Sequence, residues 1–534
     1  MKLSSSLALM SGPFALAACF SAPVERPITL VTQQTNVRVD QSVKNQVDMV
    51  FMVDDSLSMR PKQEELRARF PELIKVLDDF SKKGSPADYH IGVVTSDLGS
   101  GPTVVSSNCK PGGRGGRFQA IGAGAMAGCV GPTGKAYIEY NQLMKDANGN
   151  PVSNLPGNKS VDDLAATFTC MSSVGDGGCG FEHQLEAVYR AVHDAPNLAE
   201  NQGFFRPNAL LVIVFVTDED DCSADPNTTL FSQPDTSAMY GAQNSYRCTH
   251  FSVMRDDPAG GSTPVLMPYG DSGGAVMNPR SATVDVGQLL FPIDRYTNYF
   301  GKSSAVGGAK LNPQDVIMVG ITAPSEPTSS VLAIKGSTNP LQPCSAQSAT
   351  CLPTLQHSCS SPNNPLFYGD PAVRLNGVIN SLAADHRQLT SICDTSYQSA
   401  LQGLGQLIVS QIGPGCISSP FKDPNNPDCT VTDITPSATG GDTTKAIPPC
   451  KDSGGMIPAG GACWQLVKRN VDTMTAKACQ PTCENVGDAA QQFGVEILRA
   501  KDPDSGTRAQ VACATVAIPP RTGPDPLNPL GCGP

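Results

Sequence analysis

The sequence predicts an α/β protein with a doubly wound, mostly parallel sheet, followed by a small β-rich domain. Apolar runs without polar alternation occupy residues 47–53, 89–95, 208–217 and 316–321, and such runs are typical of parallel strands buried on both faces. Segments with helical spacing separate these runs. After residue 413 the pattern changes to short strand-like pieces among Pro, Gly and Asp turns, with eight cysteines before the C-terminus. Eight cysteines in so short a region favour a disulfide-stapled β domain.

The first 18 residues predict a secretory signal peptide. They contain one lysine, an apolar middle and the ending Leu16-Ala17-Ala18-Cys19, and the apolar part is too short to remain in a bilayer as a span. The ending resembles the lipobox of bacterial lipoproteins, in which Cys19 would be lipidated; an ordinary cleavage site before a cysteine is the alternative. Phe20, rather than Asp, follows the cysteine. The resemblance therefore implies an exported, lipid-anchored protein of the outer membrane, on its periplasmic face or at the cell surface.

A polar segment, residues 19–44, follows the signal peptide. Thr, Gln and Val are interleaved there with little helical periodicity, and we expect a tether that holds the folded part away from the lipid surface. No later segment is apolar for long enough to predict a transmembrane helix.

The cysteine content indicates an oxidising compartment. The chain has 19 cysteines. Without Cys19, ten precede residue 413 and eight follow it, so each part can pair its own cysteines completely. A zinc site at Cys479 and Cys483 would need a second cysteine or histidine pair, and the sequence offers none at the usual spacing.

Composition restricts the possible partners. The net charge is -11, the pI is about 5.1, and no run of five basic residues occurs, so we expect no nucleic-acid partner. Charged residues make up only 16% of the chain, whereas Gly (51) and Pro (45) are frequent and the hydrophobic fraction is 40%. This composition favours long loops closed by disulfides over disorder.

Helices are expected between the core strands. Helical spacing occurs at residues 66–77, 181–192, 373–382 and 401–412. Pro71 lies in the first of these and should kink that helix.

We place the α/β domain at residues 45–412 and the cysteine-rich C-terminal domain at 413–534. The α/β domain contains two long stretches without clear periodicity, near 98–162 and 222–313. Such lengths are unusual for loops in a compact domain, and we expect disulfides to close them. The pairs suggested by proximity in sequence are Cys109 with Cys129 and Cys222 with Cys248.

Oxygen-bearing side chains follow the first core strand. Asp54 ends the strand, and Ser56 and Ser58 follow at alternate positions, where they can point the same way. Asp218 ends a second strand, and the carboxyl ends of parallel strands meet at one edge of the sheet. Because all these donors are oxygens, the set suits a hard cation such as Mg²⁺ better than zinc.

This set resembles the metal-ion-dependent adhesion site of the von Willebrand factor A (VWA) family. The resemblance rests on Asp54-x-Ser56-x-Ser58 after the first strand and on Thr217-Asp218 after the central strand. It implies that Ser56 and Ser58 bind Mg²⁺ (or Mn²⁺ or Ca²⁺) directly and that Asp54 and Asp218 bind directly or through water. It further implies that the carboxylate of a protein ligand completes the coordination.

Longer segments are similar to VWA-domain lipoproteins of myxobacteria and related Gram-negative bacteria. This similarity covers residues 45–415, and the cysteine-rich tail is similar to tails in those proteins. The segments that carry it are residues 89–97, 178–182, 203–207 and 217–223.

One expected metal ligand is missing. The family also uses a threonine shortly before the helix that here begins near Phe181, and the equivalent position lies close to Cys179. A disulfide, expected with Cys170, would leave this corner of the site vacant or filled by Asp176, Glu182 or water. A domain that has kept the fold and lost its metal is therefore an alternative.

Three other features have alternative interpretations. Asp220 and Asp221 predict either a second calcium-like cluster or a solvated acidic loop. Gly270-Asp271-Ser272-Gly273-Gly274 reproduces the nucleophile motif of trypsin-like proteases, but no histidine stands in the matching context. Gly301-Lys302-Ser303 looks like the end of a phosphate loop, but Tyr296 stands where the first glycine is required.

We therefore expect a binding protein and not an enzyme. The first hypothesis is a lipid-anchored envelope adhesion protein that captures a protein ligand through a divalent metal. The alternatives are a metal-free structural scaffold of an envelope assembly and, remotely, a serine hydrolase acting through Ser272.

Overall fold

The computed structural model describes most of the α/β domain and parts of the C-terminal region. The described residues are 35–42, 46–82, 87–101, 107–225, 230–231, 245–250, 254–255, 265–266, 290–326, 330–334, 351–412, 415–417, 428–435, 442–453, 458, 461–469, 492–500, 503–504 and 507–515. The predicted signal peptide and the lipidation residue Cys19 lie outside them. No described helix is both long enough and apolar enough to span a bilayer.

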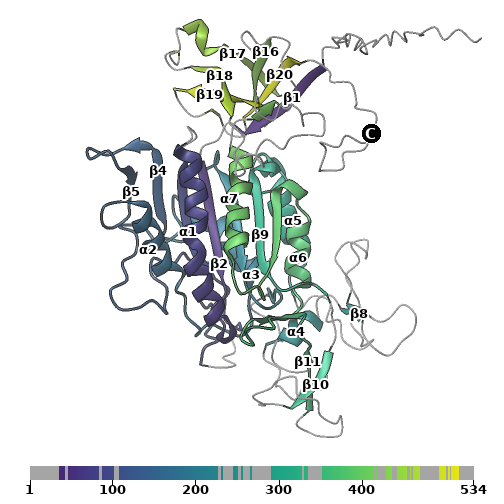
Figure 1. Cartoon of the computed structure of the whole chain (residues 1–534). Helices are drawn as coiled ribbons and strands as arrows, with labels where there is room; N and C mark the ends of the chain where they lie inside the picture. The colour runs from purple at the N-terminus through teal and green to yellow at the C-terminus, as the bar shows by residue number, and fades with distance from the viewer. Residues whose placement is uncertain are drawn as a thin grey trace, which may run out of the picture.

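A seven-stranded sheet with the order β14-β9-β6-β2-β3-β4-β5 forms the centre of the molecule, as Figure 1 shows. The pairs from β14 to β3 are parallel, whereas β4 and β5 extend the edge as antiparallel strands. The mixed α/β fold with a mostly parallel sheet agrees with the prediction. The strand bounds are β2 (Gln46–Val53), β3 (Asp88–Thr95), β4 (Ile138–Lys145), β5 (Pro151–Ser153), β6 (Leu210–Val216), β9 (Val316–Thr322) and β14 (Arg387–Ser391).

Helices cover both faces of the sheet because successive residues of a strand point to opposite faces. Met49 and Phe51 of β2 belong to one core cluster, and Val50 and Met52 belong to the other. The first cluster is completed by α1 (Arg60–Lys82), α2 (Val161–Ser172) and α7 (Gln398–Ile412). The second is completed by α3 (Gln184–His193), α5 (Asp294–Gly301) and α6 (Val373–Asn380).

Helix α1 continues through Pro71, where the sequence predicted a kink. Pro71 lies inside one 23-residue helix, and its side chain is exposed. Leu66, Phe70 and Leu73 are fully buried on the opposite side. Burial of this apolar stripe outweighs the loss of one backbone hydrogen bond at the proline.

The stretches without clear periodicity contain regular elements that the sequence analysis missed. Residues 98–162 supply β4 and β5, whose pattern is weak because an edge hairpin is only half buried. The second stretch contains α5, and the other helix and strands described in and around it are α4 (Ser245–His250), β7 (Met254–Arg255), β8 (Val265–Leu266), β10 (Ser330–Ile334), β11 (Cys351–Leu355), β12 (Cys359–Ser360) and β13 (Tyr368–Gly369).

The disulfides confirm one expected pair and correct two others. Cys222 pairs with Cys248 as expected. Cys109 pairs with Cys179 and Cys129 pairs with Cys170, so the expected pairs Cys109–Cys129 and Cys170–Cys179 are wrong. Proximity in sequence gave the wrong pairs because the loop after β3 folds back onto residues 170–179, so that its two cysteines bond to Cys179 and Cys170. The remaining described pairs are Cys359–Cys393, Cys429–Cys513 and Cys450–Cys463, and no described pair crosses residue 413.

The C-terminal region is β-rich, as predicted, but one strand comes from the N-terminal segment. Residues 35–42, part of the segment expected to be a tether, form β1 (Thr35–Ser42), which pairs antiparallel with β20. The local sequence Thr-Asn-Val-Arg-Val suits a strand. The two sheets have the orders β1-β20-β16-β17 and β15-β19-β18. Their other strands are β15 (Gly415–Ile417), β16 (Cys429–Thr435), β17 (Thr443–Ile447), β18 (Ala462–Arg469), β19 (Gln492–Arg499) and β20 (Arg508–Thr515).

Candidate functional site

The predicted site residues converge at the carboxyl end of the parallel sheet. Asp54 follows β2 and Asp218 follows the neighbouring strand β6. The backbone N–H of Asp54 donates to the carbonyl of Val216, 3.0 Å away. Both carboxylates are essentially inaccessible to solvent. The parallel register therefore brings together two residues separated by more than 160 positions.

Neutral donors hold the Asp54 carboxylate. Thr217 Oγ1 donates to Asp54 Oδ2 at 2.6 Å, and the backbone N–H of Ser56 donates to Oδ1 at 2.8 Å. Ser96 Oγ, from the end of β3, lies 3.3 Å from Oδ1. Gln184 Nε2 donates to Thr217 Oγ1 at 3.0 Å and so fixes that hydroxyl. Burial and the nearby Asp218 carboxylate raise the pKa of Asp54 to about 6.

The two serines complete a continuous set of oxygens. A short 3₁₀ turn, Leu57–Met59, follows Ser56 and places Ser58 back over the strand end. Ser56 Oγ lies 3.3 Å from Ser58 Oγ, and Ser58 Oγ donates to Asp218 Oδ1 at 3.0 Å. The structure thus brings together Asp54, Ser56, Ser58 and Asp218, the four residues predicted as metal ligands.

A lysine that the sequence analysis missed lies within this set. Lys62, on the first turn of α1, is fully buried and forms a salt bridge with Asp218 Oδ2. Its Nζ also donates to the carbonyl of Ser58 at 3.3 Å, and it lies 4.4 Å from the centroid of the Tyr368 ring. The spacing of four residues from Ser58 was a usable signal, because it places Lys62 above the same strand end.

More carboxyl groups surround the four residues. Burial and the neighbouring Glu219 carboxylate raise the pKa of Glu182 well above its usual range. Burial, and then the charges of Asp370 and Asp218, raise the pKa of Glu219 in the same way. Burial thus favours the protonated form of these two carboxyl groups, and Lys62 is the cation in direct contact with Asp218.

The backbone next to Asp54 is fixed from the opposite side. The N–H of Gly178 donates to the carbonyl of Asp55 at 2.8 Å, and a Cβ at this glycine would collide with the Asp55 side chain. Gln63 Nε2 donates to the carbonyl of Asp54 at 2.7 Å. Burial, followed by the Asp97 carboxylate, raises the pKa of Asp55 to about 8.

A disulfide-bonded cysteine stands where the resemblance to the VWA family implies a threonine ligand. Cys179 is fully buried and bonded to Cys109, so it offers no hydroxyl. Of the two possible substitute ligands, Asp176 lies at the rim, 3.8 Å from Arg60, and its side chain is 40% exposed. Glu182 is buried, and its carboxyl interacts with the nearby carboxyl groups of Glu219 and Asp54.

Asp220 and Asp221 form neither a calcium-like cluster nor a solvated loop. Both are buried. Asp220 accepts from the backbone N–H groups of Arg374 and Leu375 at the start of α6, and Asp221 accepts from the N–H of Leu185 at the start of α3. The two carboxylates thus hold two helix N-termini against the end of the sheet, and the Arg374 guanidinium pairs with Asp221 at 3.1 Å.

The donor chemistry of the site fits a hard divalent cation. Asp54, Asp218 and two serine hydroxyls supply oxygen alone, the donor type preferred by Mg²⁺, Mn²⁺ and Ca²⁺. Among the described residues, no group of three or more His, Cys, Asp or Glu side chains forms a metal centre by itself. A cation at this position would therefore depend on the serines.

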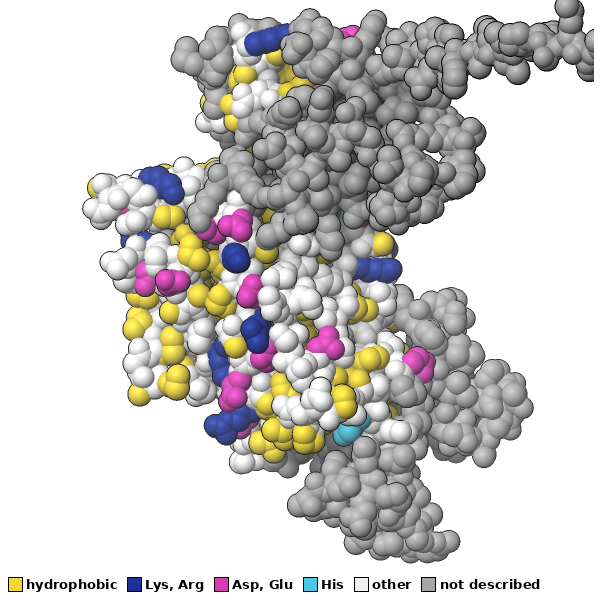
Figure 2. Space-filling view, viewed as in Figure 1, with side chains coloured by type: hydrophobic (Ala, Val, Ile, Leu, Met, Phe, Trp, Pro, Cys, Tyr) yellow, Lys and Arg dark blue, Asp and Glu magenta, His cyan; other side chains and the backbone are white. Residues whose placement is uncertain are grey.

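The rim of the site carries exposed apolar side chains. Leu57, between the two serines, is 78% exposed, and Leu366, two residues before Tyr368, is 58% exposed. Figure 2 shows hydrophobic side chains gathered at the end of the α/β domain where α1 begins.

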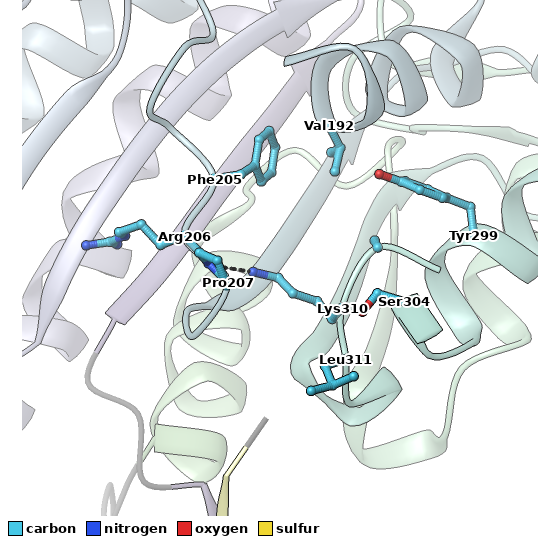
Figure 3. Close-up of a pocket in the computed structure, with 9 residues that line it drawn as sticks. Val192, Phe205, Arg206, Pro207, Tyr299, Ser304, Lys310 and Leu311 are labelled. Atoms are coloured by element: carbon cyan, nitrogen blue, oxygen red, sulfur yellow. Dashed lines mark hydrogen bonds between the residues drawn. The ribbon is translucent and has the colours of Figure 1, made fainter. Parts of the chain in front are cut away.

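A separate cavity of about 200 Å³ lies between α3 and the segment after α5. In Figure 3 the Lys310 side chain reaches across its base, and Nζ donates to the carbonyl of Arg206 at 2.8 Å. The cavity shares no lining residue with the Asp54 site. Its lining includes Val192, Phe205, Tyr299, Ala309 and Leu311.

Comparisons with known proteins identify distant neighbours. No family model and no curated protein sequence matches the chain. The pilus adhesin SpaC from Lactobacillus rhamnosus GG, in its open conformation, is 10% identical, with a TM-score of 0.29 over 89% of this chain and 39% of that one. The pilus adhesin RrgA from Streptococcus pneumoniae is 12% identical, with a TM-score of 0.27 over 89% of this chain and 57% of that one. The tip pilin GBS104 from Streptococcus agalactiae is 11% identical, with a TM-score of 0.26 over 89% and 80%.

These likenesses are too low to transfer a function to this chain, which spans well under two thirds of the first two neighbours. The serine of the protease-like motif, Ser272, lies outside the described residues.

Proposed function

We propose that this chain is an exported binding protein whose Asp54–Asp218 site holds a divalent cation, Mg²⁺ or Mn²⁺ or Ca²⁺, and captures the carboxylate of a protein ligand. The observation that carries the proposal is the contact chain from Ser56 to Ser58 to Asp218, beside Asp54, at the carboxyl end of the sheet. An anionic, oxygen-only set is the arrangement in which a divalent cation offsets the cost of buried carboxylates.

In this proposal Ser56 and Ser58 bind the cation directly, and Asp54 and Asp218 bind directly or through water. Thr217 keeps the Asp54 carboxylate oriented. A carboxylate from the ligand then takes the remaining coordination position. The exposed Leu57 beside the site would contact an apolar part of the same ligand. A lipid on Cys19 would keep the protein at the outer membrane.

Isothermal titration of Mg²⁺ and Mn²⁺ into the oxidised full chain tests the metal step. We expect saturable binding that Asp54→Ala abolishes, and unchanged binding in the control Glu64→Ala, which removes an exposed carboxylate from α1. With Mn²⁺ bound, added acetate should lower the water-proton relaxation enhancement as carboxylate displaces bound water. Absence of saturable binding in the wild-type chain would contradict the proposal.

Two observations favour a second candidate, a metal-free structural scaffold of an envelope assembly. Lys62 already neutralises Asp218, and Cys179 is committed to a disulfide. In that case the chain would bind no divalent cation, and a chelator would leave its partner interactions unchanged. A hydrolase acting through Ser272 would instead require labelling of that serine by a fluorophosphonate probe.

A further inference from the structure

Lys62 occupies an unfavourable position for a lysine. It lies in the first turn of α1, where the positive end of the helix dipole disfavours a cation, and that turn contains no acidic residue. Its side chain is also completely excluded from solvent, which is costly for an ammonium group without a partner. Its placement therefore requires strong compensation from the residues around it.

That compensation comes from three sides. Asp218 Oδ2 takes the salt bridge, the carbonyl of Ser58 accepts at 3.3 Å, and the ring of Tyr368 lies 4.4 Å from Nζ. Both oxygens of Asp218 are thereby engaged, because Oδ1 accepts from Ser58 Oγ at 3.0 Å. The ammonium thus holds Asp218 and the serine turn in the arrangement that would bind a cation.

The same contacts oppose metal binding. A divalent cation that bound Asp218 and Ser58 would lie within a few ångströms of the Lys62 ammonium, and like charges at such separations in a buried site repel strongly. The flexible four-carbon stem of lysine allows Nζ to leave while α1 stays in place. Metal and ammonium are therefore alternatives at Asp218.

We propose that Lys62 is a built-in counter-ion of the Asp54–Asp218 site, which preserves the geometry of the site when no metal is bound and raises the divalent-cation concentration needed to fill it. This inference rests on the proposed metal site and adds its regulation. The protein would then bind its ligand only where divalent cations are plentiful enough to displace the lysine.

The test compares the full chain with Lys62→Met, Lys62→Arg and the matched control Lys75→Met, which removes an exposed lysine from the same helix. Mn²⁺ titration and thermal unfolding, with Mn²⁺ or with chelator, are measured for each. In chelator we expect Lys62→Met to unfold at a lower temperature than wild type. It should bind Mn²⁺ at least about tenfold more tightly, because the competing charge is gone. Lys62→Arg and Lys75→Met should bind Mn²⁺ no more tightly than wild type.

The outcomes separate this inference from the proposed function. Equal Mn²⁺ affinity in wild type and Lys62→Met would overturn the counter-ion role and leave the metal site intact. Binding by Lys62→Met alone would support the counter-ion role and show that the lysine replaces the metal in the wild-type chain. Binding by neither would overturn both. If Lys62→Met does not fold in chelator, recovery of folding by Mn²⁺ supports the inference, and failure to recover contradicts it.

Discussion

Two fully buried aspartates, Asp48 within strand β2 and Asp54 directly after it, have surroundings that are opposite in kind. Asp48 has two basic side chains beside it: the Arg206 guanidinium donates to it at 2.8 Å, and Lys310 Nζ lies 4.0 Å away. Asp54 receives hydrogen bonds from hydroxyl and backbone groups and is in contact with no cationic side chain among the described residues.

This comparison shows how one strand can serve two purposes. At the Asp48 end the protein supplies all the opposite charge, and the result is a structural ion network. At the Asp54 end the carboxyl groups of the described residues outnumber the basic side chains near them, and Lys62 pairs with Asp218. An incompletely neutralised buried cluster indicates a binding site better than buried charge alone does.

The largest expected effect comes from removing the guanidinium group that neutralises Asp48. Arg206→Ala removes the cation from both Asp48 and Asp88, which lies 2.6 Å from the guanidinium. Because the buried Asp48 carboxylate would lose its hydrogen-bonded partner, we expect a loss of about 3–5 kcal/mol in the free energy of unfolding. Urea denaturation measures this loss, and added Mn²⁺ should not restore it. A loss below about 1 kcal/mol would show that the network is not structural.

The substitution Asp54→Asn, at the candidate metal site, should change the stability of the protein in a different way from Arg206→Ala. In chelator we expect little loss of stability, since the change removes a buried charge and keeps the shape of the side chain. With Mn²⁺ at about 100 times its dissociation constant, the wild-type chain should gain about 2.7 kcal/mol, and Asp54→Asn should gain nothing. Urea denaturation with and without Mn²⁺ separates the two proteins. An equal gain in both would place the metal elsewhere.

The sequence predicted the strands and the meeting of Asp54 with Asp218. It did not predict which basic side chains neutralise the buried carboxylates. The apolar runs before Asp54 and Asp218 predicted the strands, and the parallel sheet brought the two carboxylates together. Lys62 was missed because a lysine at the start of a helix normally points to solvent. The partners of Asp48 were missed because Arg206 and Lys310 come from loops more than 150 residues away in the chain. Local patterns determine strands and helices, whereas the pairing of buried charges and of cysteines depends on how loops fold back.

A third experiment measures how the stability of the protein depends on pH through the Asp55 carboxyl group. The pKa of Asp55 is raised from its ordinary value of 3.8 to about 8, so between these values the folded state holds a proton that the unfolded chain has released. Stability from this group is full at low pH and is lost as pH rises through about 8. In chelator we expect the melting temperature of the wild-type chain to fall between pH 5 and pH 9. Asp55→Asn should show a shallower fall, and parallel curves would contradict this origin.

The smallest effect is expected from a substitution at the exposed rim of the candidate metal site. Asp176 and Arg60 are 40% and 75% exposed and 3.8 Å apart, and exposed ion pairs contribute little to stability. Asp176→Asn should therefore leave both the melting temperature and the Mn²⁺ affinity unchanged. Glu182→Gln, at the buried substitute position, should weaken Mn²⁺ binding. Weaker Mn²⁺ binding by Asp176→Asn, with unchanged binding by Glu182→Gln, would identify Asp176 as the ligand that replaces the threonine.

The position of β1 determines how tension would pass through the molecule. β1 directly precedes β2 in the chain, and β2 leads straight into Asp54, Ser56 and Ser58. Figure 1 shows β1 and strands β16 to β20 at one end of the α/β sheet and the start of α1 at the other. With a lipid on Cys19, a pull on a captured ligand would travel along the covalent backbone of these two strands to the membrane. Strand β20 is paired with β1 side by side, so the sheet behind it would move with β1 without being stretched.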